Sequence, residues 1–191
     1  MCIFLLAVIG SKSMGKRVVT QQERAMIFRR YTPADRTTCI AILDSNMPRY
    51  FSQQDRIEFL AFLEAPVGTY NILEREEGQI IGCGGIATRD EEQTGILTWG
   101  MIQRDYHKQG WGRQLAFLRL RQLSEYPTLK KIALNTSQES AGFFEKLGFH
   151  ATEFLPNFYC EGLHCVKMEL QVDGEFEQRL AAIEAQLKYP L

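Results

Sequence analysis

The sequence lacks the features that mark several large classes of protein. Its 191 residues carry 22 basic and 23 acidic side chains, so no excess of charge indicates nucleic acid or a membrane surface as a partner. No internal repeat or low-complexity tract interrupts the chain. These absences leave one globular domain, or one domain with extensions, that is long enough to bury a core.

A long hydrophobic segment is missing as well. The apolar run at residues 1–10 is far shorter than the ~20 residues that a membrane-spanning helix needs. No basic residue precedes this run, and no clear small-x-small cleavage site follows it, as a signal peptide would require. We expect residues 1–25 to be a disordered extension or to lie upstream of the true start. A signal or anchor is the alternative interpretation.

Cysteine pairs and metal-ligand patterns are also missing. The five cysteines are odd in number, form no C-x-x-C pair and show no zinc-ligand spacing. We therefore expect no bound metal and reduced thiols in a cytoplasmic protein. The cysteines are Cys2, Cys39, Cys83, Cys160 and Cys165.

The most informative stretch of the chain is residues 102–115. It follows an apolar run at residues 96–102 and opens a segment rich in helix formers at residues 115–123, which predicts a strand, a glycine loop and a helix. Gly110 and Gly112 stand at the first turn of this helix, where the backbone N–H groups have no partner inside the helix. Such a helix end binds anions.

Charged side chains around the glycines agree with an anion site. His107, Lys108 and Arg113 place cationic groups beside the loop, while Trp111 and Leu115 are expected to point into the protein. The loop matches neither the P-loop pattern nor the dinucleotide fingerprint. We therefore predict that the loop binds a phosphate or pyrophosphate. The alternative interpretation is an ordinary helix start that binds no ligand.

Two motifs carry a resemblance to a known family. Residues 107–112, His-Lys-Gln-Gly-Trp-Gly, resemble the acetyl-CoA pyrophosphate loop of the GNAT acetyltransferases, with His107 where the family normally has Gln or Arg. Residues 137–149 resemble the second signature of that family, with Ser137 in place of an Asn and Phe144 in place of a Tyr. Because both motifs occur in the correct order and spacing, the chain is identified as a member of the GNAT superfamily over roughly residues 27–170.

The resemblance implies an α+β fold with a mixed, mostly antiparallel central sheet flanked by helices. Residues 26–172 would form the acetyltransferase domain. In such a domain the fourth strand, here residues 96–102, splays from the fifth, here residues 130–135, and Gly100 suggests a bulge at that point. The pantetheine arm enters the gap, and the backbone N–H of Ile102 faces the thioester carbonyl.

The remaining elements are predicted from their patterns. Thr32 and Pro33 indicate a first helix, and apolar spacing over residues 56–64 indicates a second, with a break at residues 44–48 between them. The C-terminal segment, residues 173–191, is predicted to form an amphipathic helix over residues 173–188. This helix packs on its own domain or contacts a second copy. The other predicted strands are residues 26–31, 70–75, 80–88, 150–155 and 165–170, with a loop at residues 156–164.

The resemblance names acetyl-CoA as the co-substrate and gives its binding residues. These are Ile102, Arg104, His107, Lys108, Gln109, Gly110, Trp111, Gly112, Arg113, Ser137 and Phe144.

The sequence departs from the family at the catalytic acid. Many members use the Tyr of the second signature to protonate the leaving thiolate, and Phe144 cannot do so. Neither splayed strand, residues 96–102 or 132–135, carries an Asp or Glu as a base. Tyr159 and His164 are the candidates for acid and base, with a packed aromatic residue and a surface histidine as the plainer interpretations.

The prediction for function is an N-acetyltransferase that moves the acetyl group of acetyl-CoA to a primary amine by direct attack. The acceptor would be a small-molecule or peptide amine, with no nucleic acid, membrane or metal involved. A CoA-binding sensor or scaffold without transferase activity is the alternative, and Phe144 is its best support.

Overall fold

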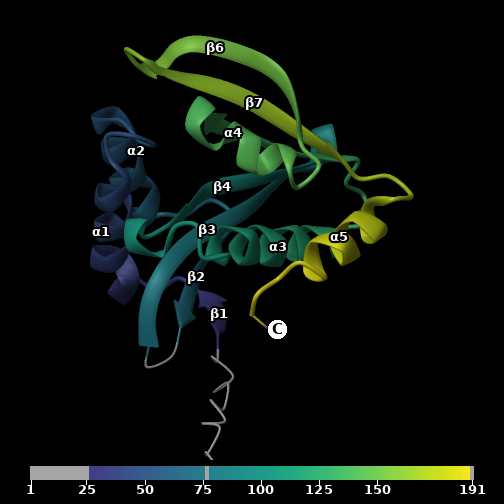
Figure 1. The fold of residues 1–191 in the computed structure, drawn as a ribbon, viewed down its shortest axis with the longest axis horizontal. Helices are drawn as coiled ribbons and strands as arrows, with labels where there is room; N and C mark the ends of the chain where they lie inside the picture. The colour runs from purple at the N-terminus through teal and green to yellow at the C-terminus, as the bar shows by residue number, and fades with distance from the viewer. Residues whose placement is uncertain (1–25, 76–77, 190–191) are drawn as a thin grey trace, which may run out of the picture.

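A seven-stranded sheet forms the centre of the computed structural model, which describes residues 26–75 and 78–189 (Figure 1). The strands lie in the order β1-β2-β3-β4-β5-β7-β6, and of these pairs β4 with β5 is parallel and the others are antiparallel. The predicted mixed, mostly antiparallel α+β fold is confirmed. The expectation for residues 1–25 lies outside the described residues. The strands are β1 Ile27–Arg30, β2 Thr69–Arg75, β3 Gln79–Arg89, β4 Thr94–Ile102, β5 Lys131–Ser137, β6 His150–Cys160 and β7 Leu163–Gln171.

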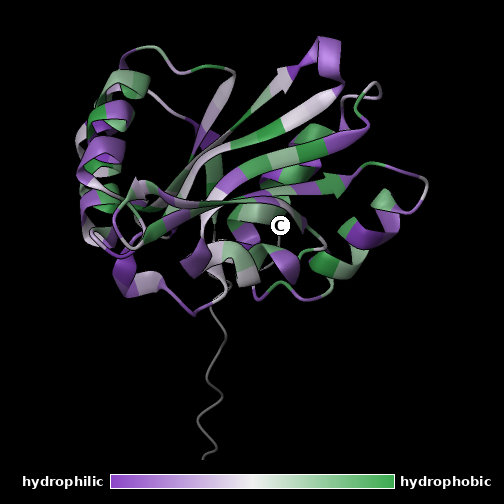
Figure 2. Cartoon of the chain, turned by 90° about the horizontal axis from the view of Figure 1, so that it is seen from above, coloured by the Kyte–Doolittle hydropathy of each residue, from purple (hydrophilic) through white to green (hydrophobic). Residues whose placement is uncertain are grey.

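Helices cover both faces of this sheet. On β2, Ile72 packs with α1 and α2, whereas its neighbour Leu73 packs with α3, because successive strand side chains point to opposite faces. Hydrophilic and hydrophobic residues alternate along the outer helices (Figure 2), as expected for helices that bury one side. The helices are α1 Arg36–Asn46, α2 Gln53–Glu64, α3 Trp111–Ser124, α4 Gln138–Glu145 and α5 Phe176–Glu184, with short 3-10 turns at Pro33–Asp35, Asp90–Glu92 and Arg104–Tyr106.

Strand β4 leaves β5 shortly after the two begin to pair. The pairing extends only to Ile96 of β4, although both strands continue. Farther along, Trp99 and Gly100 together face Gly84 of β3, which is a β-bulge. Trp99 has a φ of 42°, in the left-handed region that bulky residues rarely adopt. The predicted bulge is confirmed. Beyond the bulge β4 stays paired with β3, but its opposite edge, the one toward β5, has no strand partner up to Ile102 in the described part of the chain.

The segment predicted as a loop at residues 156–164 is instead part of a hairpin, so that prediction is wrong. Strand β6 runs to Cys160 and β7 starts at Leu163. Residues 156–159 form a bulge opposite His164. The bulge includes Pro156, which has no N–H to donate to the neighbouring strand. In Figure 1 the hairpin arches over α4.

The C-terminal helix is shorter than predicted. Helix α5 spans Phe176–Glu184 rather than the whole of residues 173–188. Its apolar side packs on its own domain, against α3, and the contact with a second copy remains a prediction. The chain after α5 returns to the start of α3, where the ring of Tyr189 stacks on Trp111 with centroids 3.6 Å apart.

Strand β1 ties the beginning of the described chain to the domain. Arg29 donates to the carboxylate of Asp35 through Nη1 (2.8 Å) and Nη2 (2.7 Å), and to Glu74 through Nε (2.5 Å). The guanidinium lowers the pKa of Asp35 to about 2. Met26 and Phe28 pack against the buried cluster on the α3 face. Met26 and β1 are therefore packed as part of the domain.

We expect a chain shortened to begin at Met26 to fold and to melt within a few degrees of the full chain. The reason is that Met26 and the strand after it carry the packing and ion pairs that close this edge of the sheet. Thermal melting of both chains, followed by circular dichroism, checks this. Aggregation of the shortened chain would show that residues 1–25 belong to the core. Among the described residues, no helix is both long and apolar enough to cross a membrane.

Candidate active site

The glycine loop between β4 and α3 presents a row of backbone N–H groups. The first hydrogen bond of the helix runs from the N–H of Gln114 to the carbonyl of Gly110 (3.1 Å). The N–H groups of Trp111, Gly112 and Arg113 precede it and have no partner inside the helix. Gly110 has a φ of 104°, which L side chains rarely adopt. The predicted order of strand, glycine loop and helix is confirmed, and this helix end can bind an anion.

Basic side chains surround the loop without acidic partners. Lys108 is exposed and Arg113 is half-buried, and neither takes part in an ion pair with another described residue. Arg104 lies toward the α1–α2 connection, with its guanidinium 5.4 Å from the ring centroid of Tyr50. Trp111 is 1% exposed and anchors the loop in the core, as predicted. Free N–H groups and uncompensated positive charge together fit a pyrophosphate.

Side chains from two other elements hold the end of β4. The carbonyl of Ile102 accepts hydrogen bonds from Nδ2 of Asn46 (2.8 Å) and Nε2 of His107 (2.8 Å). The N–H of Gln103 donates to the carbonyl of Ile81 on β3 (2.8 Å). Because successive residues of a strand direct their N–H and carbonyl groups to opposite edges, those of Ile102 point away from β3. The N–H of Ile102 therefore lies on the open edge of β4.

Asn46 contributes to this site although no motif in the sequence marks it. The sequence predicts a break at residues 44–48, but α1 continues to Asn46. Asn46 is 3% exposed and also donates to the carbonyl of Ile42 (2.9 Å). Its contact with Ile102 joins positions 56 residues apart, which no local pattern encodes. The available signal was its place seven residues after Cys39, on the apolar side of the helix.

Helix α4 follows β5 directly and lies beside the glycine loop. Ser137 ends β5, stands at the N-cap position of α4 without a side-chain capping hydrogen bond, and is 5% exposed. The ring of Phe143 lies 3.7 Å from the place that a Cβ on Gly112 would occupy. Phe144 packs edge-on against Phe149, with centroids 5.7 Å apart, so the family's tyrosine position carries a half-buried apolar ring that packs against the core cluster.

Tyr159 lies on the bulge of β6, at the open end of the splay. Its hydroxyl contacts Sγ of Cys165 (3.6 Å), and Cys165 pairs with Ser137 at the end of β5. Burial raises the pKa of Tyr159, and the neighbouring thiol and the carboxylates of Asp55 and Glu58 on α2 raise it further. The phenol therefore keeps its proton well above neutral pH.

His164 faces the same bulge with its ring already engaged. The N–H of Asn157 donates to Nδ1 of His164 (2.9 Å), so in the neutral ring the proton is on Nε2. The backbone N–H of His164 donates to Oε1 of Gln138 (2.8 Å), whose Nε2 donates to the carbonyl of Gly162 (2.9 Å). Gln138 thereby fastens the hairpin to the start of α4.

A hollow of about 440 Å³ opens beside these residues. It lies between the α1–α2 connection, the start of α4 and the β6–β7 turn. Arg49 donates to the carboxylate of Glu139 through Nε (2.7 Å), which links the α1–α2 connection to α4 along its wall. The lining residues are Pro48, Arg49, Gln138, Glu139, Cys160, Glu161, Gly162 and Leu163.

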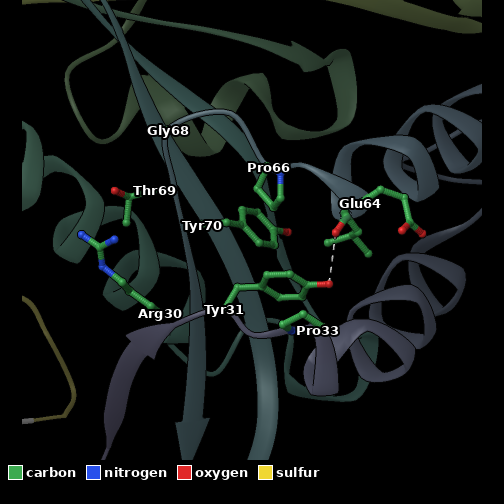
Figure 3. A pocket seen from close by; sticks show the side chains of 9 residues that line it. Arg30, Tyr31, Pro33, Glu64, Pro66, Gly68, Thr69 and Tyr70 are labelled. Atoms are coloured by element: carbon green, nitrogen blue, oxygen red, sulfur yellow. Dashed lines mark hydrogen bonds between the residues drawn. The ribbon is translucent and has the colours of Figure 1, made fainter.

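A second hollow, of about 300 Å³, lies at the C-terminal end of α2 (Figure 3). The rings of Tyr31 and Tyr70 meet edge-to-face there, with centroids 5.7 Å apart, and the Tyr31 hydroxyl donates to the carbonyl of Leu63 (3.3 Å). None of the residues predicted for the site lines this hollow. We therefore do not include it in the candidate active site.

Comparison with known proteins decides the family. The model of the acetyltransferase (GNAT) domain matches residues 55–172, more than half of the chain. The chain belongs to the GNAT acetyltransferase family. It is accordingly an acyltransferase. The resemblance in the two motifs implied a splay of β4 from β5 beside the glycine loop, and the structure has that splay. No curated protein matches the sequence.

Solved structures share the GNAT fold at low sequence identity. A GNAT-family protein from Desulfovibrio desulfuricans is 21% identical with a TM-score of 0.65, covering 78% of this chain and 100% of its own. The ribosomal-protein-S18-alanine N-acetyltransferase from Escherichia coli is 16% identical with a TM-score of 0.64, covering 78% and 95%. Spermidine N-acetyltransferase from Vibrio cholerae, in complex with CoA and spermine, is 16% identical with a TM-score of 0.61, covering 76% and 95%. At these identities the likeness shows the fold alone.

Proposed function

We propose that this GNAT enzyme transfers the acetyl group of acetyl-CoA to a primary amine by direct attack within a ternary complex. The observation that carries the proposal is the open edge of β4 beside the free N–H groups of the glycine loop. An extended arm with amide groups can pair with such an edge as an added strand. The loop then lies where the phosphates at the other end of the arm can be bound.

We assign the binding of acetyl-CoA to the residues around the loop. The N–H groups of Gln109 to Arg113 bind the pyrophosphate, and the side chains of Lys108 and Arg113 neutralise its charge. His107 acts through the peptide of Ile102 rather than on the phosphate, because its Nε2 is engaged there. The remaining assigned residues are Arg104 near the loop, and Ser137 and Phe144 along α4.

The chemistry that we propose at the open edge is acyl transfer. The neutral amine nitrogen attacks the thioester carbon, a C–N bond forms, and the C–S bond breaks. The N–H of Ile102 donates to the carbonyl oxygen as negative charge develops on it, a contribution of about 3 kcal/mol in comparable sites. Asn46 and His107 hold the carbonyl of Ile102, which lies in the next peptide unit, and so restrain the backbone on the C-terminal side of that N–H.

Protons must move at the leaving sulfur and at the attacking nitrogen during the reaction. We propose that Tyr159 protonates the leaving thiolate, since its raised pKa keeps the phenol protonated and its hydroxyl lies at the open end of the splay. His164 is a weak candidate for the base, because Nδ1 already accepts a hydrogen bond from Asn157 and Nε2 carries the proton of the neutral ring. The acceptor ammonium gives up one proton before the attack, and the nitrogen gives up a second once the C–N bond has formed. Both protons leave through water in the hollow, toward Glu139 or Glu161.

The hollow is the proposed entry for the acceptor. It carries the carboxylates of Glu139 and Glu161 against one guanidinium, Arg49, which suits a small-molecule or peptide amine that arrives as a cation. The related structures include enzymes named for a ribosomal-protein alanine and for spermidine, so the GNAT fold serves both kinds of amine. We place the reaction in the cytoplasm, where the thiols of the protein stay reduced.

An acceptor panel with free-thiol detection tests this function. Purified protein and acetyl-CoA are mixed with peptides bearing a free N-terminus, lysine peptides, polyamines or aminoglycosides, and the release of CoA thiol is followed. We expect acceptor-dependent release with at least one class, together with the acetylated amine by mass spectrometry. Binding of CoA without release on any acceptor would support a sensor instead.

A further inference from the structure

Arg119 is a buried cation that none of the assigned roles uses. It stands on α3 and is 3% exposed. Its guanidinium lies against the sheet at the bulge of β4: a Cβ on Gly100 would be 2.5 Å from both Nη atoms, and one on Gly84 would be 3.1 Å from Nη1. Glycine at both positions leaves room for the guanidinium directly beneath the bulge.

The contacts of Arg119 do not compensate its charge. Nε donates to the carbonyl of Leu115 (3.3 Å) and Nη1 to that of Thr98 (3.5 Å), and no carboxylate pairs with it among the described residues. Burial lowers the pKa of Arg119 to about 10, which leaves it charged at neutral pH. A buried charge without a partner costs stability, so packing alone does not account for an arginine here.

The location of the guanidinium suggests what it does instead. Arg119 contacts the bulge from the α3 face, and from the opposite face the hydroxyl of Tyr70 donates to the carbonyl of Trp99 (3.1 Å). The bulge is therefore held from both sides. It lies between Ile96, the last residue paired with β5, and Ile102, whose N–H is on the open edge.

We propose that Arg119 is a positioning residue for acetyl transfer, which rests on the function proposed above. It fixes the bulge and so sets the direction in which the edge of β4 meets the thioester. Its positive charge, held in a site shielded from water, also favours negative charge that develops on the reacting carbonyl. The pyrophosphate is bound by a separate loop, so the effect of Arg119 falls on turnover rather than on affinity.

The test compares Arg119→Met with Arg119→Lys, and with Arg121→Met as the matched control. Arg121 is on the same helix but exposed, and pairs with Glu177. On an acceptor that the unaltered enzyme acetylates, we expect Arg119→Met to lower kcat between about 10-fold and 100-fold, as misplacement of reacting groups does. KM for acetyl-CoA should change less than about threefold, because the loop is untouched. Arg119→Lys should recover part of the loss, and Arg121→Met should change nothing.

Thermal melting separates positioning from a structural role. Replacing an unpaired buried charge with an apolar side chain should leave the melting temperature of Arg119→Met equal or higher. A lower melting temperature, or a kcat within twofold of the unaltered enzyme, overturns the assignment. If Arg119→Met does not fold, that overturns the assignment as well. An unaltered enzyme with no turnover on any acceptor instead overturns the proposed function, and this inference with it.

Discussion

Replacing Tyr159 with Phe is expected to lower the turnover number about 100-fold, the usual contribution of a general acid. The hydroxyl is the group that we assign to protonate the leaving thiolate, and it lies beside Sγ of Cys165 at the open end of the splay. Burial keeps it protonated. The affinity for acetyl-CoA should not change, because the pyrophosphate loop is on a different element. Steady-state kinetics at saturating acetyl-CoA, with thiol detection, measures both quantities.

Two further variants complete the measurement on Tyr159. Tyr126→Phe is the control, since Tyr126 is an exposed tyrosine after α3, outside the assigned site, and its loss should leave kcat unchanged. Phe144→Tyr restores the hydroxyl at the family position, and in the Tyr159→Phe background it should raise kcat if that hydroxyl reaches the sulfur. A kcat for Tyr159→Phe within twofold of the unaltered enzyme would assign the proton to water and leave Tyr159 as a packed aromatic residue.

Replacing Gly110 with Val is expected to weaken both the binding of acetyl-CoA and the fold. The φ of 104° at Gly110 is strained for any residue with a Cβ, at a cost of about 1–2 kcal/mol. The new Cβ would also stand 2.9 Å from Cδ of Lys188, in the segment after α5. The loop must move to relieve the backbone strain and the contact with Lys188. The backbone N–H groups at the start of α3 then no longer point in a common direction.

The size of the Gly110→Val effect follows from these two causes. A destabilisation of about 1–2 kcal/mol lowers the melting temperature of a chain of this size by roughly 2–8 °C. Loss of one hydrogen bond to a charged phosphate, about 1.5–3 kcal/mol, weakens binding roughly 10-fold to 100-fold. Melting curves and calorimetric titration with acetyl-CoA check the two effects separately. Unchanged melting and unchanged affinity together would show that the loop tolerates a Cβ at this position.

The elements that the sequence predicted best are those with local signals. The apolar run before the loop, the two glycines and the helix formers after them determine the order of β4, loop and α3, because each acts within a few residues of the chain. The bulge at Gly100 was predicted for the same reason, since a glycine inside a strand marks such a site. The second motif likewise located α4, which begins directly after Ser137.

The parts that the sequence did not predict depend on distant contacts. Strand β6 continues through residues 156–159 because β7 supplies pairing partners on both sides of the bulge. Since β6 is an exposed edge strand, its sequence does not alternate between apolar and polar residues, and this local signal of a strand is missing. Asn46 and Arg119 belong to the surroundings of the site only because the fold brings their helices against β4. On a helix, an arginine is usually solvated, so nothing local distinguishes Arg119 from the exposed Arg121.

Calorimetric titration of Gly112→Val with acetyl-CoA tests the central claim most directly, namely that the loop at the start of α3 holds the pyrophosphate. The nearest atoms to a Cβ at Gly112 belong to the ring of Phe143 at 3.7 Å, an ordinary contact, and Val has a higher helix propensity than Gly. Its melting temperature should therefore stay within a few degrees of the unaltered protein. Gly174→Val is the control, because no atom lies within 4 Å of a Cβ there. We predict that Kd for acetyl-CoA rises about 10-fold or more for Gly112→Val and not for Gly174→Val, since only the first places a side chain against the phosphates. Equal affinity in the two variants would contradict the claim.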